Sequence, residues 1–217
     1  MNRIVVIMIS LLCLGSCNTK ETKSVLTSTN LTSVEQLPYF DSADFTPRWS
    51  KPAHRIPEFS FINQNGETIT NDDYKGKIYV ADFFFTTCPG ICPKLEKHMS
   101  LLEVHYRDDN EIKFLSHTVM PWVDDVETLK GYEINNDINA TKWNLVTGER
   151  DALYEIARNG YFADEDFVKT QDESEFIHTE NFILVDKEGF IRGVYNGTIE
   201  LDIRRLMRHI DILKRES

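Results

Sequence analysis

The sequence predicts an α/β fold with a mixed central sheet that is flanked by helices and preceded by an N-terminal hairpin. Strand-like apolar segments alternate with segments of helical periodicity, two pairs of short strand-like segments are each joined by a turn sequence, and 217 residues suit one folded domain. A hydrophobic content of 41% excludes disorder throughout the chain, and four cysteines are too few and too clustered for a disulfide-stapled scaffold.

The first elements are a hairpin and a buried strand. Residues 59–62 and 68–70 flank an Asn-Gly dipeptide at 65–66, which favours a tight turn between antiparallel strands. Residues 78–85 form a nearly continuous apolar run whose one charge is Asp82, as is typical of a central strand buried on both faces. The hairpin therefore comes before the centre of the sheet.

A helix follows the buried strand, and the later elements continue the alternation. Pro93 suits the first position of a helix, and apolar side chains recur at helical spacing to about residue 107. The later segments are a strand at 112–118, a helix at 125–135, a short helix at 151–158 closed by Gly160, strands at 182–185 and 190–195 around a turn at 186–189, and a helix at 200–215. The last two strands form a second hairpin, which makes the sheet mixed.

The N-terminal region has the features of an export signal. Arg3 is followed by an apolar run at 4–14 that is too short to span a membrane, and Leu-Gly-Ser-Cys at 14–17 resembles a bacterial lipobox. We expect residues 1–16 to be a lipoprotein signal peptide, Cys17 to carry the lipid, residues 17–55 to form a tether and a proline-rich arm laid against the domain, and residues 56–217 to form the domain. An uncleaved short anchor or an ordinary cleavage site is the alternative.

The charge balance and the export signal limit the partners and the compartment. The 24 basic and 35 acidic residues give a net charge of −11, and the basic residues form no long run. Because phosphate backbones are bound by clustered positive charge, nucleic acid is not an expected partner. Export places the protein in the cell envelope, on the extracytoplasmic side of a membrane, where the cytosolic glutathione pool does not keep thiols reduced.

Cys88 and Cys92 stand between the buried strand and the start of the helix, which is a thioredoxin-like arrangement. The unpaired N–H groups of a helix N-terminus stabilise thiolate relative to thiol. At a spacing of four residues the two Cβ atoms lie about 5 to 6 Å apart on one face, so the sulfurs can bind one soft ion or, with modest backbone adjustment, close to a disulfide. Two thiolates suit Cu(I) best, with Zn(II) as the competitor.

A metal held by two thiolates needs further ligands, and the six histidines are the candidates. We expect His98 and His105, on the helix after the dithiol, to lie on the surface, and His209, on the last helix, to be solvated. His117 and Met120 suit packing better than a role as auxiliary copper ligands.

His178 is the preferred third ligand. It stands just before the strand expected at 182–185, where a thioredoxin-like fold brings a loop over the dithiol. Thioredoxin-like oxidoreductases normally carry a cis-proline in that loop, but this chain has no proline after Pro121, which favours a metal site over general disulfide exchange. Asp82 lies six residues before Cys88, like the buried aspartate that helps to move protons in thioredoxins. A strand-end carboxylate satisfied by local hydrogen bonds is an equally good interpretation of Asp82.

The segment around the dithiol is specific. It reads Phe-Thr-Thr-Cys-Pro-Gly-Ile-Cys-Pro at 85–93, and His178 precedes Asn-Phe-Ile-Leu-Val-Asp at 181–186. Supporting segments are Trp-Asn-Leu-Val-Thr-Gly at 143–148 and Gly-Lys at 76–77. In these residues the chain resembles the Sco/SenC family of cytochrome c oxidase assembly proteins, whose motif is F-T-x-C-P-x-x-C-P.

The resemblance implies a thioredoxin-like fold that binds copper through Cys88, Cys92 and His178. Family members help to deliver copper to the CuA centre of cytochrome c oxidase subunit II, and other copper donor or thiol reductant proteins are further partners. The leading hypothesis is therefore a membrane-tethered copper metallochaperone rather than an enzyme. The alternative is an extracytoplasmic thiol-disulfide oxidoreductase in which Cys88 attacks a disulfide of the partner, Cys92 resolves the intermediate and Asp82 moves protons.

The chain departs from the family pattern in two places. Gly90 stands where members often have Asp between the cysteines, which removes a negative charge that could tune copper affinity or thiol pKa. Many members also have an S-x-D-P-x-x-D-like stretch, whereas residues 116–124 place Met120 and Trp122 there. This second departure is either a changed partner surface or simple drift.

Overall fold

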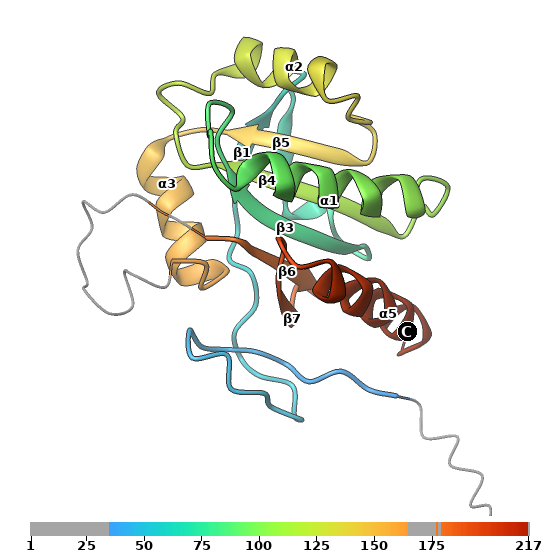
Figure 1. The fold of residues 1–217 in the computed structure, drawn as a ribbon. Coiled ribbons are helices and arrows are strands. Elements are labelled where there is room, and N and C mark those ends of the chain that lie inside the picture. Colours follow the sequence, from blue (N-terminus) through green and yellow to red (C-terminus); the bar gives the residue numbers. More distant parts are fainter. Residues whose placement is uncertain (1–34, 165–176, 178, 217) are drawn as a thin grey trace, which may run out of the picture. The chain divides into compact units, whose positions relative to one another are not determined.

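Seven strands form one mixed sheet in the order β2-β1-β5-β4-β3-β6-β7 (Figure 1). The computed structural model describes residues 35–164, 177 and 179–216. The strands are β1 (Ser60–Asn63), β2 (Thr68–Thr70), β3 (Ile78–Phe84), β4 (Ile112–Thr118), β5 (Trp143–Thr147), β6 (Asn181–Val185) and β7 (Ile191–Asn196). The helices are α1 (Cys92–His105), α2 (Val126–Asn135), α3 (Arg150–Glu155) and α5 (Glu200–Glu216), with a 3-10 turn η1 (Asn71–Asp73) and a π-helical turn η2 (Ile156–Gly160).

The centre of the sheet is parallel and its margins are antiparallel. Strands β3, β4 and β5 pair in parallel, whereas β1 runs antiparallel to β5 and β6 runs antiparallel to β3. The pairs β1–β2 and β6–β7 are the two predicted hairpins, and their turns contain Gly66 and Gly189 at φ angles of +77° and +86°. Glycine adopts such angles without a steric penalty. The predicted α/β fold with a mixed sheet and an N-terminal hairpin is confirmed.

The sequence does not reveal β5, although the other elements agree closely with the prediction. All five residues of β5 are buried, because the strand lies between β4 and β1 and is covered on both faces. Its polar members Asn144 and Thr147 hide the continuous apolar pattern expected of such a strand. The short helix predicted at 151–158 is α3 continued by η2, and it ends at Gly160 as predicted.

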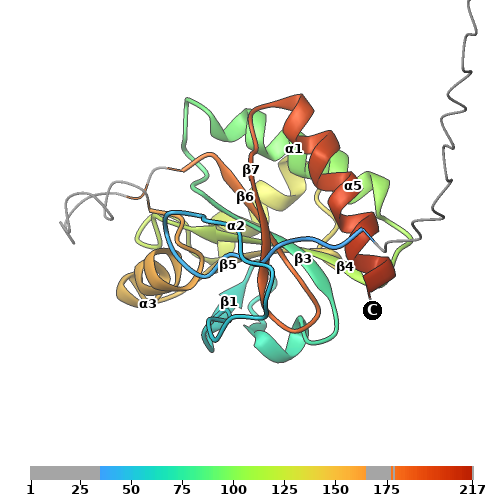
Figure 2. The same ribbon diagram turned by 90° about the horizontal axis from the view of Figure 1, so that it is seen from below.

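The sheet separates two hydrophobic cores (Figure 2). Helices α1, α2 and α5 contribute Met99, Leu129 and Leu206 to one core, where all three are fully buried. Helix α3 and the residues after η2 contribute Leu153 and Tyr161 to the other. Figure 2 shows α1 and α5 on one side of the sheet and α3 on the other. Strand β3 supplies side chains to both cores, as its apolar sequence predicts.

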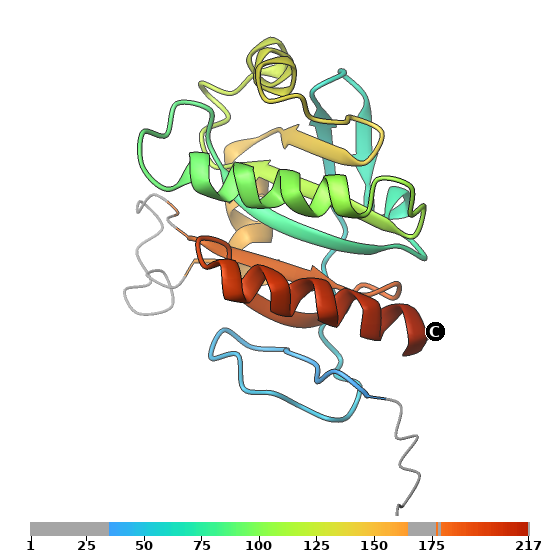
Figure 3. The same cartoon turned by 45° about the vertical axis from the view of Figure 1, so that its right-hand side comes forward.

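Helices α1 and α5 lie side by side and run in the same direction (Figure 3). Near the end of α1 the hydroxyl of Tyr106 donates to the backbone oxygen of Met207, in the middle of α5, at 3.0 Å. Near the start of α1, His98 contacts the backbone of Gly197, just before α5 begins. Both helices therefore begin at the same edge of the sheet, the edge where β3 ends.

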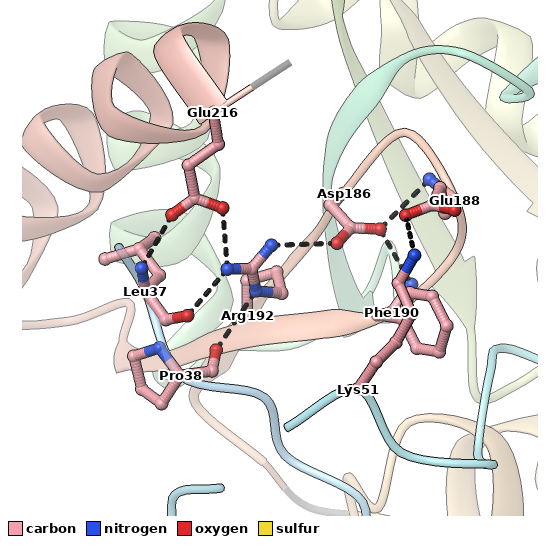
Figure 4. A network of polar contacts seen from close by, with 8 residues as sticks. All are labelled: Leu37, Pro38, Lys51, Asp186, Glu188, Phe190, Arg192 and Glu216. Atoms are coloured by element: carbon pink, nitrogen blue, oxygen red, sulfur yellow. Dashed lines mark hydrogen bonds and ion pairs between the residues drawn. The ribbon is translucent and has the colours of Figure 1, made fainter. Parts of the chain in front are cut away.

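The segment before β1 is fastened to the domain by Arg192, a buried residue of β7 (Figure 4). The Arg192 guanidinium donates to Asp186 at 3.0 Å and to Glu216 at 2.7 Å. It also donates to the backbone oxygens of Leu37 at 2.6 Å and Pro38 at 3.1 Å. Glu216 in turn accepts a hydrogen bond from the Leu37 N–H at 2.6 Å. One cation thus joins the arm to β7 and to the end of α5.

Candidate metal centre

The two cysteines lie where β3 ends and α1 begins. Cys92 is the first residue of α1 and Pro93 follows it, within one residue of the predicted start. Cys88 is half-buried, and its N–H donates to the Phe85 oxygen at 3.3 Å. Cys92 is 7% exposed and packs in the core beside the helices, and both cysteines are free thiols. One sulfur is therefore accessible to a partner and the other is shielded.

The two thiols differ in acidity. Burial opposes ionisation of Cys88, but the Cys92 thiol and the backbone N–H groups of Gly90, Ile91 and Cys92 act more strongly and hold the pKa of Cys88 below its ordinary value. Burial raises the pKa of Cys92, and the adjacent Cys88 sulfur and the Asp82 carboxyl raise it further. The pair therefore favours a thiolate on Cys88 and a proton on Cys92.

Asp82 lies on β3 behind the dithiol and is 3% exposed. Its carboxylate accepts a hydrogen bond from the Ser116 hydroxyl, which accepts one from the Trp143 indole N–H at 2.7 Å. Burial raises the pKa of Asp82 to about 7, against the opposing effect of the Ser116 hydrogen bond. Asp82 and Cys92 line a common cavity of about 10 Å³, about the smallest that can hold one water. The carboxyl is thus satisfied locally, and it shares a small cavity with the buried thiol of Cys92.

A second buried carboxylate, Asp124, fixes the loop before Cys88. Asp124 accepts hydrogen bonds from the Thr86 N–H at 3.3 Å and from the Thr86 hydroxyl at 2.5 Å, and it also accepts one from the Thr118 hydroxyl. Because Thr86 stands two residues before Cys88, Asp124 sets the path of the chain into the motif. The available signal is that Asp124 keeps the last acidic position of the family's S-x-D-P-x-x-D-like stretch, although Met120 replaces the first.

The expectation that His98 lies on the surface is wrong. His98 is 7% exposed, and its Nδ1 lies 2.6 Å from the backbone oxygen of Gly197. The helical pattern gives no sign of this, because the loop that covers His98 is distant in sequence. His105 is exposed, as predicted.

His117 and His209 both pack against aromatic side chains. His117 is fully buried and its ring stacks on Phe83 with centroids 5.0 Å apart, so its predicted role in packing is confirmed. Burial lowers the pKa of His117 to about 3, with a weaker opposing effect from the Asp82 backbone. His209 is half-buried rather than fully solvated, and its Nδ1 lies 2.7 Å from the Tyr195 hydroxyl.

The described residues supply two sulfur donors to the candidate centre. His178 and Cys17 lie outside the described residues. Within the part of the chain that the structure describes, no group of three or more His, Cys, Asp or Glu side chains could hold a metal ion. A thiolate beside a second thiol is a donor pair that suits Cu(I), which prefers soft sulfur ligands. The residues present therefore fit copper, with a third ligand still to be supplied.

Comparison with known proteins identifies the family. The SCO1/SenC family model matches residues 48–213, a range that includes the dithiol, Asp82 and all seven strands of the described sheet. The chain belongs to the SCO1/SenC family. The SCO1 protein homolog of Bacillus subtilis is 30% identical over 146 residues, which cover 66% of this chain and 75% of the relative. A protein of Stutzerimonas stutzeri named putative copper-binding protein is 23% identical over 160 residues, covering 71% of this chain and 76% of the relative.

Solved structures agree with the fold of this SCO1/SenC protein. A SCO1/SenC family lipoprotein from Bacillus anthracis superimposes with a TM-score of 0.64 at 28% identity, covering 76% of this chain and 98% of that one. The predicted thioredoxin-like fold is thereby confirmed. Among the helices in the described ranges, none is both long and apolar enough to cross a membrane.

Proposed function

We propose that this protein is a copper metallochaperone. It binds copper through Cys88, Cys92 and His178 and delivers it to the CuA centre of cytochrome c oxidase subunit II during oxidase assembly. The observation that carries the proposal is the unequal thiol pair at the start of α1 in a chain of the SCO1/SenC family. The relative named putative copper-binding protein supports copper as the cargo.

The unequal exposure of the two sulfurs suits transfer of copper. A metal passes between proteins through intermediates in which donor and acceptor share ligands, so at least one ligand must be accessible to the partner. Cys88 is half-buried and meets this requirement, whereas Cys92 is enclosed by the core. Cys88 is therefore the ligand that a partner's sulfur replaces first, and Cys92 is the one that releases copper last.

The same thiols favour a second candidate function, reduction of a disulfide in the partner. The Cys88 thiolate would attack one partner sulfur, forming a mixed disulfide and releasing the other sulfur as a thiolate. Cys92 would then lose its proton, attack the Cys88 sulfur and release the second partner thiolate, leaving a Cys88–Cys92 disulfide. Asp82, whose raised pKa suits proton uptake near neutral pH, would accept the proton from Cys92. The low pKa of Cys88 and the high pKa of Cys92 fit attacking and resolving roles.

Copper titration of the reduced full-length protein separates the two functions. We expect the wild type to bind one Cu(I) and His178→Ala to bind it more weakly, because copper needs the imidazole and disulfide exchange does not. Cys92→Ser should lose both copper binding and completed disulfide reduction. His105→Ala, which removes an exposed histidine from α1, is the matched control. If His178→Ala bound copper like the wild type while disulfide reduction depended on the cysteines alone, the chaperone proposal would fail.

We also propose that residues 1–16 are removed and that a lipid on Cys17 anchors the protein on the extracytoplasmic face of a membrane. The short apolar run and the lipobox-like sequence support this, as does the lipoprotein nature of the Bacillus anthracis family member. Cys17→Ser should abolish labelling by a radioactive fatty acid and move the protein from the membrane fraction to the soluble fraction. Unchanged labelling would exclude Cys17 as the anchor.

A further inference from the structure

His98 connects the helix that begins with the dithiol to the loop before α5. It lies six residues after Cys92 and is almost fully buried. Its Nδ1 is 2.6 Å from the backbone oxygen of Gly197. Because a carbonyl oxygen only accepts hydrogen bonds, Nδ1 must carry the proton. The His98 ring on α1 therefore donates a hydrogen bond to a backbone oxygen that lies 99 residues further along the chain.

Gly197 is also hydrogen-bonded to the residue that precedes β6. Its N–H donates to the backbone oxygen of Glu180 at 2.7 Å. A Cβ atom at position 197 would lie 2.7 Å from Leu95 Cδ2 on α1 and 2.8 Å from Phe182 Cε1 on β6. The backbone of residue 197 is thus wedged between the dithiol helix and β6, where only glycine fits without displacement of its neighbours.

The turn that carries Gly197 is held firmly by side chains. Asn196 donates to the Glu180 carboxylate at 2.9 Å and accepts from the Thr198 N–H at 2.9 Å. The Asn196 N–H donates to Asp202, in the first turn of α5, at 2.9 Å. On the other side of position 178, Ile177 is buried in the second core. Ile177 and Glu180 therefore each have defined contacts with the domain, and in the sequence they stand on either side of the proposed third copper ligand.

We infer that His98 is a positioning residue for copper binding. Through Gly197 it fixes Glu180, which stands two residues after the proposed ligand His178 in the sequence, relative to the helix that bears Cys92. This inference rests on the proposed function, because it concerns the third ligand assigned there. Copper held by sulfur from one element and nitrogen from another binds most tightly when the two elements are already held at the right separation.

The inference is tested by the Cu(I) affinity of the reduced full-length protein, measured by competition with a chromophoric Cu(I) chelator. We expect His98→Leu to lower the affinity about 10-fold or more, as is typical when a residue that orients a metal ligand is removed. His98→Asn places an amide N–H close to the position of Nδ1 and should retain most of the affinity. His98→Gln places its amide one bond farther along and should behave like His98→Leu. His105→Leu, at an exposed position of the same helix, should match the wild type.

A double-mutant comparison distinguishes positioning from general destabilisation. In a His178→Ala background, His98→Leu should cause no further loss of affinity. Equal losses in both backgrounds, or wild-type affinity of His98→Leu, would overturn the inference. If His178→Ala weakens binding and His98→Leu does not, only the inference fails; if His178→Ala binds like the wild type, the ligand assignment fails and the inference fails with it. Should circular dichroism show that His98→Leu is unfolded, the comparison of His98→Asn with His98→Gln decides in the same way.

Discussion

Replacing Asp82 with Asn should stabilise the metal-free, reduced protein at pH 8 and change its stability little at pH 4. Burial raises the pKa of Asp82 from 3.8 to about 7. Between these values the folded protein keeps a proton that the unfolded chain has lost, so the free energy of unfolding falls as the pH rises through this window. A pKa difference of about 3, at about 1.4 kcal/mol for each unit, corresponds to a penalty of about 4 kcal/mol at pH 8.

Asparagine isolates this penalty because it cannot ionise, while its amide oxygen can still accept the Ser116 hydrogen bond. For a domain of this size, about 4 kcal/mol corresponds to a rise of about 8 to 16 °C in the unfolding midpoint. The assay is thermal and urea unfolding at pH 4 and pH 8, followed by circular dichroism, with a phosphine reductant present and metal absent. The control is Asp151→Asn, which removes an exposed carboxylate and should change stability by less than about 0.5 kcal/mol at both pH values.

Two results would refute the reasoning about Asp82. A stabilisation of Asp82→Asn that is equal at pH 4 and pH 8 would mean that the carboxyl does not titrate between these values. A loss of stability at pH 8 would mean that the fold favours the ionised form, which reverses the sign of the argument. Other groups titrate in the same range, but they are common to both proteins, so the difference between the variant and the wild type at each pH is the quantity to compare.

Three further predictions concern other parts of the fold. Burial lowers the pKa of His117 from 6.5 to about 3, so the wild type loses stability below pH 6.5. The unfolding free energy of His117→Phe relative to the wild type, measured in urea, should therefore be about 3 kcal/mol higher at pH 4.5 than at pH 8. A difference that does not depend on pH would contradict this. Iodoacetamide at pH 7 should alkylate Cys92→Ser quickly and Cys88→Ser slowly, and equal rates would contradict the assigned acidities. Arg192→Met should cost about 3 to 5 kcal/mol of unfolding free energy, because the buried Asp186 carboxylate and the partly buried Glu216 carboxylate both lose their partner. It should also speed proteolysis near Leu37, and unchanged stability would show that this network does not hold the arm.

Local patterns are sufficient to predict the dithiol and most of the elements around it. The apolar run of β3, the proline after Cys92 and the turn glycines Gly66 and Gly189 each act within a few residues, so the sequence alone locates a strand, a helix start and two hairpins. The resemblance around Cys88 then indicates the family, because the doubled Cys-Pro is unusual.

The parts that escape prediction depend on contacts between distant segments. Strand β5 is recognisable only once β4 and β1 enclose it, and His98 is buried by a loop 99 residues further along the chain. Asp124 acts on Thr86 across a separation of 38 residues, and although it keeps the last acidic position of the family's S-x-D-P-x-x-D-like stretch, that position does not reveal which loop it binds. Such residues are found from the sheet order and the packing, not from periodicity.

The attachment of the arm by Arg192 limits how far the dithiol can lie from an anchor near the N-terminus. Gly197, just before α5, is hydrogen-bonded to His98 on the dithiol helix. At the other end of α5, Glu216 binds Leu37 (Figure 4). The 17 residues of α5 are about 25 Å long, so the arm is fastened about one helix length away from the dithiol. With a lipid on Cys17, as proposed, residues 17–36 would extend at most about 70 Å. The dithiol would then stay within a limited distance of the bilayer, and any protein that accepts copper from it must lie within that distance.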